Sequence, residues 1–188
     1  PVVRTQVFDR TLAELRRRKI TYKGVLYAGL MITSAGPKVL EFNCRFGDPE
    51  TQVVLPRMRS DLAPALEACI DGALKERHVQ WKTESAVCIV MASHGYPGAY
   101  PKGKIIKGIR QSSSFKDVVI FQAGTEMSSG RVVTAGGRVL GVTALGKSLS
   151  QAVGQAYRAA QGVWFEGAHY RKDIAARALK RGAGRARR

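Results

Sequence analysis

Hydrophobic and polar positions in the first part of the chain follow a helix period and then a strand period. Apolar side chains three and four residues apart predict an amphipathic helix over residues 9–19. Apolar residues 25–32 predict a strand, residues 33–38 a turn, and residues 39–46 a second strand. Two neighbouring strands joined by a short turn pair most simply as an antiparallel hairpin.

Two helices are predicted after the second strand. Asp48 is a good N-cap and Pro49 suits the first helical position, so a short helix is expected to begin there and end near Pro56. Ser60 is predicted to cap a longer helix that ends near residue 76. Apolar residues at helical spacing form one stripe along this helix: Leu62, Leu66, Cys69, Ile70 and Ala73.

The pattern changes after polar residues 79–85 to short apolar runs separated by Gly and Pro. A helix is predicted at the end of this region, from Ser148 or Ser150 to about residue 161. The short apolar runs predict strands over residues 86–92, 104–109, 117–122, 131–135 and 138–145. Helices and strands in both parts of the chain together predict an α+β fold.

The predicted strand over residues 39–46 carries different chemistry on its two faces. Since successive side chains point to opposite faces, Glu41, Asn43 and Arg45 share one face, and the apolar side chains between them share the face that can enter a core. Carboxylate and amide oxygens suit a hard cation such as Mg²⁺, and a guanidinium can bind a phosphate bidentately. The same alternation occurs in any half-buried strand, so a solvated polar face is the alternative.

A longer motif around this strand resembles a known family. Residues 41–52 read E-F-N-C-R-F-G-D-P-E-T-Q, which resembles the metal-binding strand and following loop of glycinamide ribonucleotide synthetase (phosphoribosylamine–glycine ligase), a member of the ATP-grasp superfamily. Several separate motifs in the expected order are more specific than any one of them. The further segments that resemble this family are residues 22–31, 93–98, 121–125, 134–142 and 170–174.

The resemblance implies an activity and roles for five residues. The family joins glycine to 5-phosphoribosylamine in purine biosynthesis, using ATP and a glycyl phosphate intermediate. By resemblance, Glu41 and Asn43 would ligate Mg²⁺ or Mn²⁺, and Arg45 would bind the ATP phosphates and stabilise the transferred phosphoryl group. Asp48 and Glu50 would bind the amino group of glycine or phosphoribosylamine, although starting a helix explains them equally well.

One ligand that many ATP-grasp enzymes use is absent from this sequence. Those enzymes place a further acidic metal ligand on the preceding strand, but no Asp or Glu occurs between Glu14 and Glu41. The site is therefore expected to have two protein ligands unless another part of the enzyme contributes one.

The resemblance also implies a domain organisation. Residues 1–78 would be the C-terminal part of an ATP-grasp core, 79–85 a linker and 86–175 a small, mostly β C-terminal domain with a helix. The last residues carry little of the resemblance, and the composition of residues 176–188 predicts a basic tail with a frayed helix and a disordered end. The N-terminal and lid domains of the family have no counterpart in these 188 residues. We therefore expect little or no ligase activity from this chain alone.

Charge keeps a different class of function open. The formal net charge is +17, which favours anionic partners. Residues 170–188 hold eight Lys or Arg and one Asp, so much of the charge is local. A basic nucleic-acid-binding module is thus an alternative function, although a solvated tail is the simpler explanation.

Gly141–Ser148 offers a third possibility because it satisfies the phosphate-binding pattern G-x-x-x-x-G-K-[ST]. It also lies between a predicted strand and a predicted helix. Its interior is apolar and β-branched, however, which favours a continuing strand over an open loop of backbone N–H groups. A nucleotide-binding protein of the P-loop type is therefore the less favoured alternative.

The remaining composition indicates a cytoplasmic protein without membrane association. Cys44, Cys69 and Cys88 have no metal or disulfide spacing and are predicted to be small buried side chains in a reducing compartment. No apolar run approaches the ~20 residues of a membrane span, and the N-terminus lacks the regions of a signal peptide. The sequence begins at Pro1 without an initiator Met, so an upstream start is expected.

Overall fold

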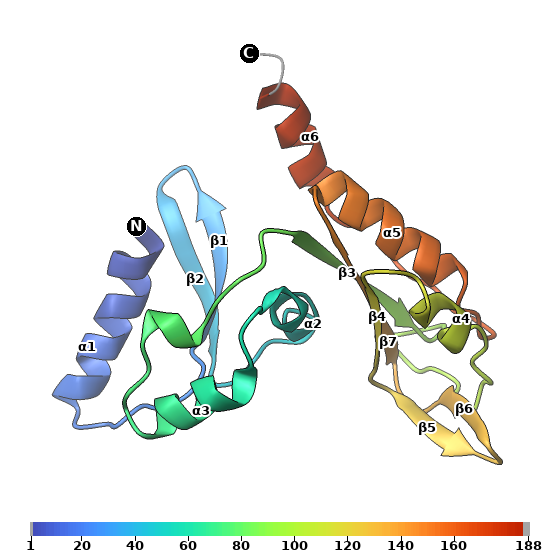
Figure 1. Ribbon diagram of the computed structural model, residues 1–188, viewed down its shortest axis with the longest axis horizontal. Coiled ribbons are helices and arrows are strands. Elements are labelled where there is room, and N and C mark those ends of the chain that lie inside the picture. Colours follow the sequence, from blue (N-terminus) through green and yellow to red (C-terminus); the bar gives the residue numbers. More distant parts are fainter. Residues whose placement is uncertain (1, 186–188) are drawn as a thin grey trace. The chain divides into compact units, whose positions relative to one another are not determined.

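The computed structural model describes residues 2–185 and has an α+β fold with antiparallel strands (Figure 1). The chain divides into two compact units. The first unit holds residues 1–48 and 60–80, and the second holds residues 49–59 and 81–188. The short segment 49–59 thus packs with the part of the chain that follows it by more than twenty residues.

The first unit is built on a two-stranded hairpin with helices. The predicted first helix is present but begins earlier, since the π-helical turn η1 (Arg4–Asp9) runs directly into α1 (Arg10–Arg17). The hairpin pairs β1 (Tyr27–Thr33) with β2 (Gly36–Asn43), as predicted, and a bulge lies between Gly29 and Leu30. Only residues 34–35 form the turn, so the strands extend further into it than the sequence predicts.

The longer helix of the first unit differs from the prediction at both ends. α3 (Leu62–Ile70) is capped by Asp61, whose Oδ1 accepts from the Ala63 amide at 3.1 Å. The predicted cap, Ser60, instead uses its Oγ to accept from the Gln80 amide at 3.0 Å. The apolar stripe does not form a core, because on α3 only Ala65 is buried. The short 3₁₀ turn η3 (Glu76–His78) follows further along the chain.

The second unit is built on a three-stranded antiparallel sheet in the order β3-β7-β4. Its strands are β3 (Ser85–Ala92), β4 (Val118–Gln122) and β7 (Arg138–Gly146), close to the predicted positions. α5 (Leu149–Gln161) packs on β3 and β7, and Ser148 caps it by accepting from the Gln151 amide, as predicted.

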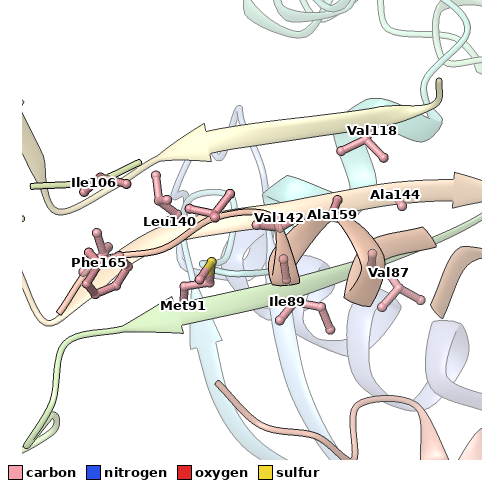
Figure 2. Close-up of a cluster of buried hydrophobic side chains, with 14 of the residues drawn as sticks. Val87, Ile89, Met91, Ile106, Val118, Leu140, Val142, Ala144, Ala159 and Phe165 are labelled. Atoms are coloured by element: carbon pink, nitrogen blue, oxygen red, sulfur yellow. The ribbon is translucent and has the colours of Figure 1, made fainter. Parts of the chain in front are cut away.

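The core of the second unit lies between this sheet and α5. Four alanines of α5 are fully buried, so small side chains let the helix approach the sheet closely. Phe165, in the segment after the helix, is 1% exposed and closes one end of the core. Figure 2 shows the apolar side chains that meet here, among them Val87, Ile89, Met91, Val118, Leu140, Val142, Ala144 and Ala159.

The segment 49–59 covers the other face of β7. It forms α2 (Thr51–Val54) and the 3₁₀ turn η2 (Leu55–Arg57). A Cβ placed on Gly141 would lie 3.5 Å from Cγ of Gln52, an ordinary van der Waals distance, so this position of β7 faces α2. This contact explains why β7 is buried on both faces.

Four smaller elements complete the second unit. α4 (Ile109–Ser113) and β5 (Thr125–Ser128) have no counterpart in the prediction, whereas β6 (Arg131–Thr134) was predicted and pairs with β5. The strand predicted over 104–109 is wrong, since this segment makes only isolated bridges at Ile105 and Lys107. The chain then forms α6 (Ala176–Arg185), so this part of the predicted tail is helical, and residues 186–188 lie outside the described residues.

Two further findings concern cysteines and membranes. All three cysteines are free thiols, but the prediction that they are buried is wrong: Cys44 is exposed, and Cys69 and Cys88 are half-buried. Within residues 2–185, no helix is both long enough and apolar enough to cross a membrane.

Candidate functional site

The hairpin brings Glu41 and Asn43 together on one face of β2, as the alternation predicts. The Asn43 Nδ2 group donates a hydrogen bond to Oε1 of Glu41 at 3.1 Å. In the register of the hairpin, Glu41 lies opposite Gly29 and Asn43 opposite Tyr27. The two oxygen-bearing side chains are therefore adjacent without any help from a distant part of the chain.

Gly29 provides the surface over which the Glu41 side chain lies. A Cβ at this position would be 3.0 Å from Cγ of Glu41 and 3.6 Å from its Oε1. The absence of a side chain on Gly29 thus leaves room for the Glu41 side chain where it lies. The sequence offers no signal for this role, because it depends on the register of the hairpin and on the bulge that follows Gly29.

Arg45 does not continue the alternation as predicted. β2 ends at Asn43, and Arg45 lies in a bend where its Nη1 donates to the carbonyl oxygen of Phe46 at 2.9 Å. Its exposed guanidinium therefore follows the Glu41–Asn43 pair in the chain but is positioned by the bend rather than by the pleat. The expectation of a buried opposite face is also wrong, because Phe42 is 43% exposed.

Asp48 and Glu50 lie in a turn rather than at the positions the sequence predicts. Asp48 is not the N-cap of α2; Glu50 takes that position, and its carbonyl oxygen accepts from the amides of Val53 and Val54 at 3.1 and 2.9 Å. The boundary between the two units falls between Asp48 and Pro49. Asp48 therefore belongs to the unit of the Glu41–Asn43 pair, and Glu50 belongs to the other.

Tyr22 is a neighbour of this region that sequence reasoning missed. Burial raises the pKa of its phenol, and contact with the thiol of Cys44, the residue after Asn43, raises it further. The phenol donates to the carbonyl oxygen of Val25 at 2.8 Å. Tyr22 is therefore a neutral hydrogen-bond donor at neutral pH.

The Glu41–Asn43 pair fits a divalent cation that takes part of its coordination from other molecules. Within residues 2–185 no group of three or more His, Cys, Asp or Glu side chains could hold a metal by itself. Mg²⁺ commonly uses one or two protein side chains together with substrate phosphates and water. Adjacent carboxylate and amide oxygens on an open strand match that pattern.

The structure confirms that Gly141–Ser148 is not a phosphate-binding loop. Residues 141–146 form the buried end of β7, the middle strand of the sheet. Their backbone groups therefore pair with the neighbouring strands and are not free to bind a phosphate. The Lys147 amide donates to Oε1 of Gln151 at 2.9 Å, and Ser148 caps α5. The motif therefore marks a strand-to-helix junction.

Two family models match this chain. The ATP-grasp (A) domain of phosphoribosylglycinamide synthetase matches residues 2–51, and the C domain of the same synthetase matches residues 86–177. Together these segments cover more than half of the chain and include the Glu41–Asn43 pair. The chain belongs to the phosphoribosylglycinamide synthetase family. The resemblance of residues 41–52 to that family is thereby confirmed.

Relatives of the phosphoribosylglycinamide synthetase family align along nearly the whole chain. It is 50% identical over 179 residues to phosphoribosylamine–glycine ligase of Synechocystis, covering 94% of this chain and 42% of the relative. It is 49% identical over 178 residues to the trifunctional purine biosynthetic protein adenosine-3 of Gallus gallus, covering 94% of this chain and 18% of that protein.

A solved structure in the phosphoribosylglycinamide synthetase family shares the fold. The crystal structure of phosphoribosylamine–glycine ligase from Thermotoga maritima superposes with a TM-score of 0.78 at 37% identity, covering 90% of this chain and 41% of that one. This chain therefore spans about two fifths of the length of the single-function ligases that it resembles.

Proposed function

We propose that this chain is the C-terminal portion of an ATP-dependent ligase that joins glycine to 5-phosphoribosylamine. The names of its relatives support the activity. The observation that carries the proposal is the hydrogen-bonded Glu41–Asn43 pair, which presents two hard oxygen-bearing side chains on one strand face. The three free thiols are consistent with the proposed cytoplasmic location.

In this proposal Glu41 and Asn43 hold the divalent cation, either Mg²⁺ or Mn²⁺. When bound, the ion would neutralise charge on the ATP phosphates. Arg45 binds the phosphoryl group being transferred, because its exposed guanidinium can offer a bidentate fork to phosphate oxygens. Asp48 and Glu50 bind the amino group of glycine or phosphoribosylamine as carboxylates.

The proposed reaction activates a poor acyl donor. A carboxylate oxygen of glycine attacks the γ-phosphorus of ATP, and ADP leaves. The amine of phosphoribosylamine then attacks the acyl carbon of glycyl phosphate, phosphate leaves, and the nitrogen loses a proton to give an amide. The protein contributes mainly by positioning the reactants and compensating charge, which is the usual form of phosphoryl-transfer catalysis.

We further propose that N-terminal and lid domains complete the site. The adenine pocket and the lysines that approach the phosphates in the family are expected there. Residues 1–188 by themselves are then expected to bind Mg·ATP weakly and to show no sustained turnover.

Calorimetric titration with Mg·ATP at moderate salt tests this proposal. The double variant Glu41→Ala/Asn43→Ala should weaken binding by about tenfold or more, because both protein ligands are lost. Glu67→Ala is a matched control, since it removes an exposed carboxylate of the same unit on α3, away from the hairpin. Equal affinity in the double variant and the native chain would overturn the assignment of the metal site.

A more conservative variant tests the geometry of the same site. Gly29→Ala keeps both ligands but forces the Glu41 side chain to move, because the new methyl group would lie 3.0 Å from Cγ of Glu41. We expect weaker Mg·ATP binding with an unchanged fold by circular dichroism. Unchanged binding would show that the position of the carboxylate over β1 does not matter.

A further inference from the structure

A cleft of about 890 Å³ lies in the second unit, between η2, the edge strand β4 and the beginning of α5. All the residues that line it belong to the second unit, so it is a different site from the Glu41–Asn43 pair. We propose that this cleft binds a small phosphorylated compound that has a planar or apolar portion, such as a nucleoside monophosphate.

Three lysines supply the positive charge of the cleft. Lys82, Lys116 and Lys147 line it from three segments that are far apart in the sequence. Lys82 donates through Nζ to the carbonyl oxygen of Pro56 at 2.8 Å, and within residues 2–185 none of the three forms an ion pair. Lysines that line one cleft without forming an ion pair favour an anion, and phosphate is the anion that best uses several of them.

Two acidic residues, Glu84 and Asp117, also line the cleft. They leave the ionisable lining with one net positive charge, so a ligand with a single phosphate group suits it better than a highly charged polyanion. This balance separates the proposal from general attraction of nucleic acid to the net charge of the whole chain.

The lining of the cleft also has an apolar part, here called the apolar wall. Leu55, Val119, Phe121 and Leu145 contribute to it, and Val119 is 40% exposed although it lies within β4. Such a surface can cover the face of a ring while the lysines hold a phosphate. Binding sites for small molecules commonly combine an apolar wall with a few polar groups in this way.

Two glutamines of α5 add polar groups to the lining of the cleft. Oε1 of Gln151 accepts from the Lys147 amide and holds the strand-to-helix junction at the cleft. Gln155 also lines the cleft, and its buried Oε1 has no hydrogen-bond partner within the described residues. A buried acceptor without a partner is costly. Because this oxygen is buried, the Gln155 amide has to turn toward the cleft before a ligand N–H group can donate to it.

The experiment is a titration of the 188-residue chain with AMP, followed by amide chemical shifts in two-dimensional NMR. EDTA is present throughout, so that Mg·nucleotide binding at Glu41 and Asn43 does not contribute. We expect shifts confined to residues 55–57, 82–84, 116–121 and 145–155. Shifts spread over basic surfaces of both units, or no shifts at millimolar AMP, would overturn the proposal.

Charge-matched variants then separate a built site from nonspecific attraction. Lys116→Gln/Lys147→Gln should weaken AMP binding about tenfold, because two charge-assisted contacts are lost. Lys38→Gln/Lys102→Gln removes the same charge from exposed lysines that do not line the cleft, and should change affinity less than about twofold. Equal losses in the two double variants would overturn the proposal, as would no loss in the first.

The apolar wall and independence from the ligase site have their own controls. Val119→Glu places a carboxylate on the wall and should abolish AMP binding, whereas adenosine and inorganic phosphate should each bind the native chain at least about tenfold more weakly than AMP. Glu41→Ala/Asn43→Ala should leave AMP binding intact. Phosphate binding as tight as AMP binding, or loss in the Glu41→Ala/Asn43→Ala variant, would contradict a separate site with an apolar wall.

Discussion

The two units of this chain differ in how much apolar surface each buries by itself. Of the buried apolar side chains in the described residues, only Val7 and Ala65 belong to the first unit, while the second contains the entire clustered core. The first unit leaves many large apolar side chains exposed: Val2, Ile20, Met31, Ile32, Val39, Leu40, Phe42, Leu66, Ile70 and Leu74.

This contrast places the proposed chemistry on the part with the least packing of its own. Complete burial of a large apolar side chain contributes roughly 1.5–3 kcal/mol, and a two-stranded hairpin alone is marginal in water. The Glu41–Asn43 pair lies on such a hairpin, whereas the central strand β7 of the second unit is buried on both faces. In this chain the second unit therefore supplies most of the stability, and the first carries the proposed metal ligands.

The largest expected effect comes from opening the core of the second unit. Phe165→Ala should lower the free energy of unfolding by about 3–5 kcal/mol, because Phe165 is 1% exposed and its removal leaves a cavity. Urea unfolding followed by tryptophan fluorescence is a suitable measurement, since both tryptophans, Trp81 and Trp164, belong to this unit.

Phe42→Ala is the matched control for Phe165→Ala. Phe42 lies on the hairpin and is 43% exposed, so the same truncation should change the fluorescence-detected unfolding by less than about 1 kcal/mol. Similar losses for the two phenylalanines would show that the units do not differ in packing as described.

A smaller effect is expected where β7 meets α5. A Cβ on Gly146 would lie 2.5 Å from the backbone nitrogen of Ala152, and backbone cannot move aside as a flexible side chain can. Gly146→Ala should therefore destabilise the second unit by about 1–3 kcal/mol, measured by the same unfolding experiment. An unchanged midpoint would mean that the junction is looser than the structure shows.

The opposite sign is expected for another glycine eight residues further along. Gly154 lies inside α5, and a Cβ there would meet nothing within 4 Å. Gly154→Ala should stabilise the second unit by about 0.4–1 kcal/mol, because alanine loses less backbone entropy on forming a helix. A thermal melt that shows destabilisation would refute the view that this position is open.

The smallest effect concerns an exposed ion pair of the first unit. Hydrogen bonds from Arg17 and then Arg18 lower the pKa of Glu14 from 4.5 to about 2. Since the folded pKa is the lower one, this contact favours the helix above pH 4.5 and is lost as the pH falls toward 2. In an NMR titration, Arg17→Ala should raise the pKa of Glu14, and Arg16→Ala should not. Because the group is exposed, we expect little change in overall stability.

The success of sequence reasoning follows the length and regularity of each element rather than the division between the units. The strands β3, β4 and β7 and the helix α5 were predicted closely, because a continuous apolar run and a Ser cap are local signals. α4 and β5 were missed, since their short segments have no clear period. The expected burial of Phe42 was wrong because alternation says which face a side chain shares, not whether that face is covered.

For the candidate site, the sequence predicted the pair but not its setting. Glu41 and Asn43 are two residues apart on one strand, so their proximity is a local consequence of the pleat. The alternation of side chains does not extend to Arg45, because the strand ends two residues earlier, at Asn43. The role of Gly29 depends on the pairing of two strands, so no pattern in the sequence predicts it. The contact of Tyr22 with Cys44 depends on the folding of residues far apart in the chain, so it is equally hidden from sequence reasoning.

The assignment of residues 49–59 to the second unit has a consequence for how this protein can be divided. The backbone passes between the units three times, after residues 48, 59 and 80. A gene split or a proteolytic cut near residue 80 would therefore separate the sheet from the α2 segment that covers it, and no single cut yields both units intact. The two units therefore cannot be expressed as two contiguous fragments. Obtaining each unit intact requires changing the order of the segments along the chain.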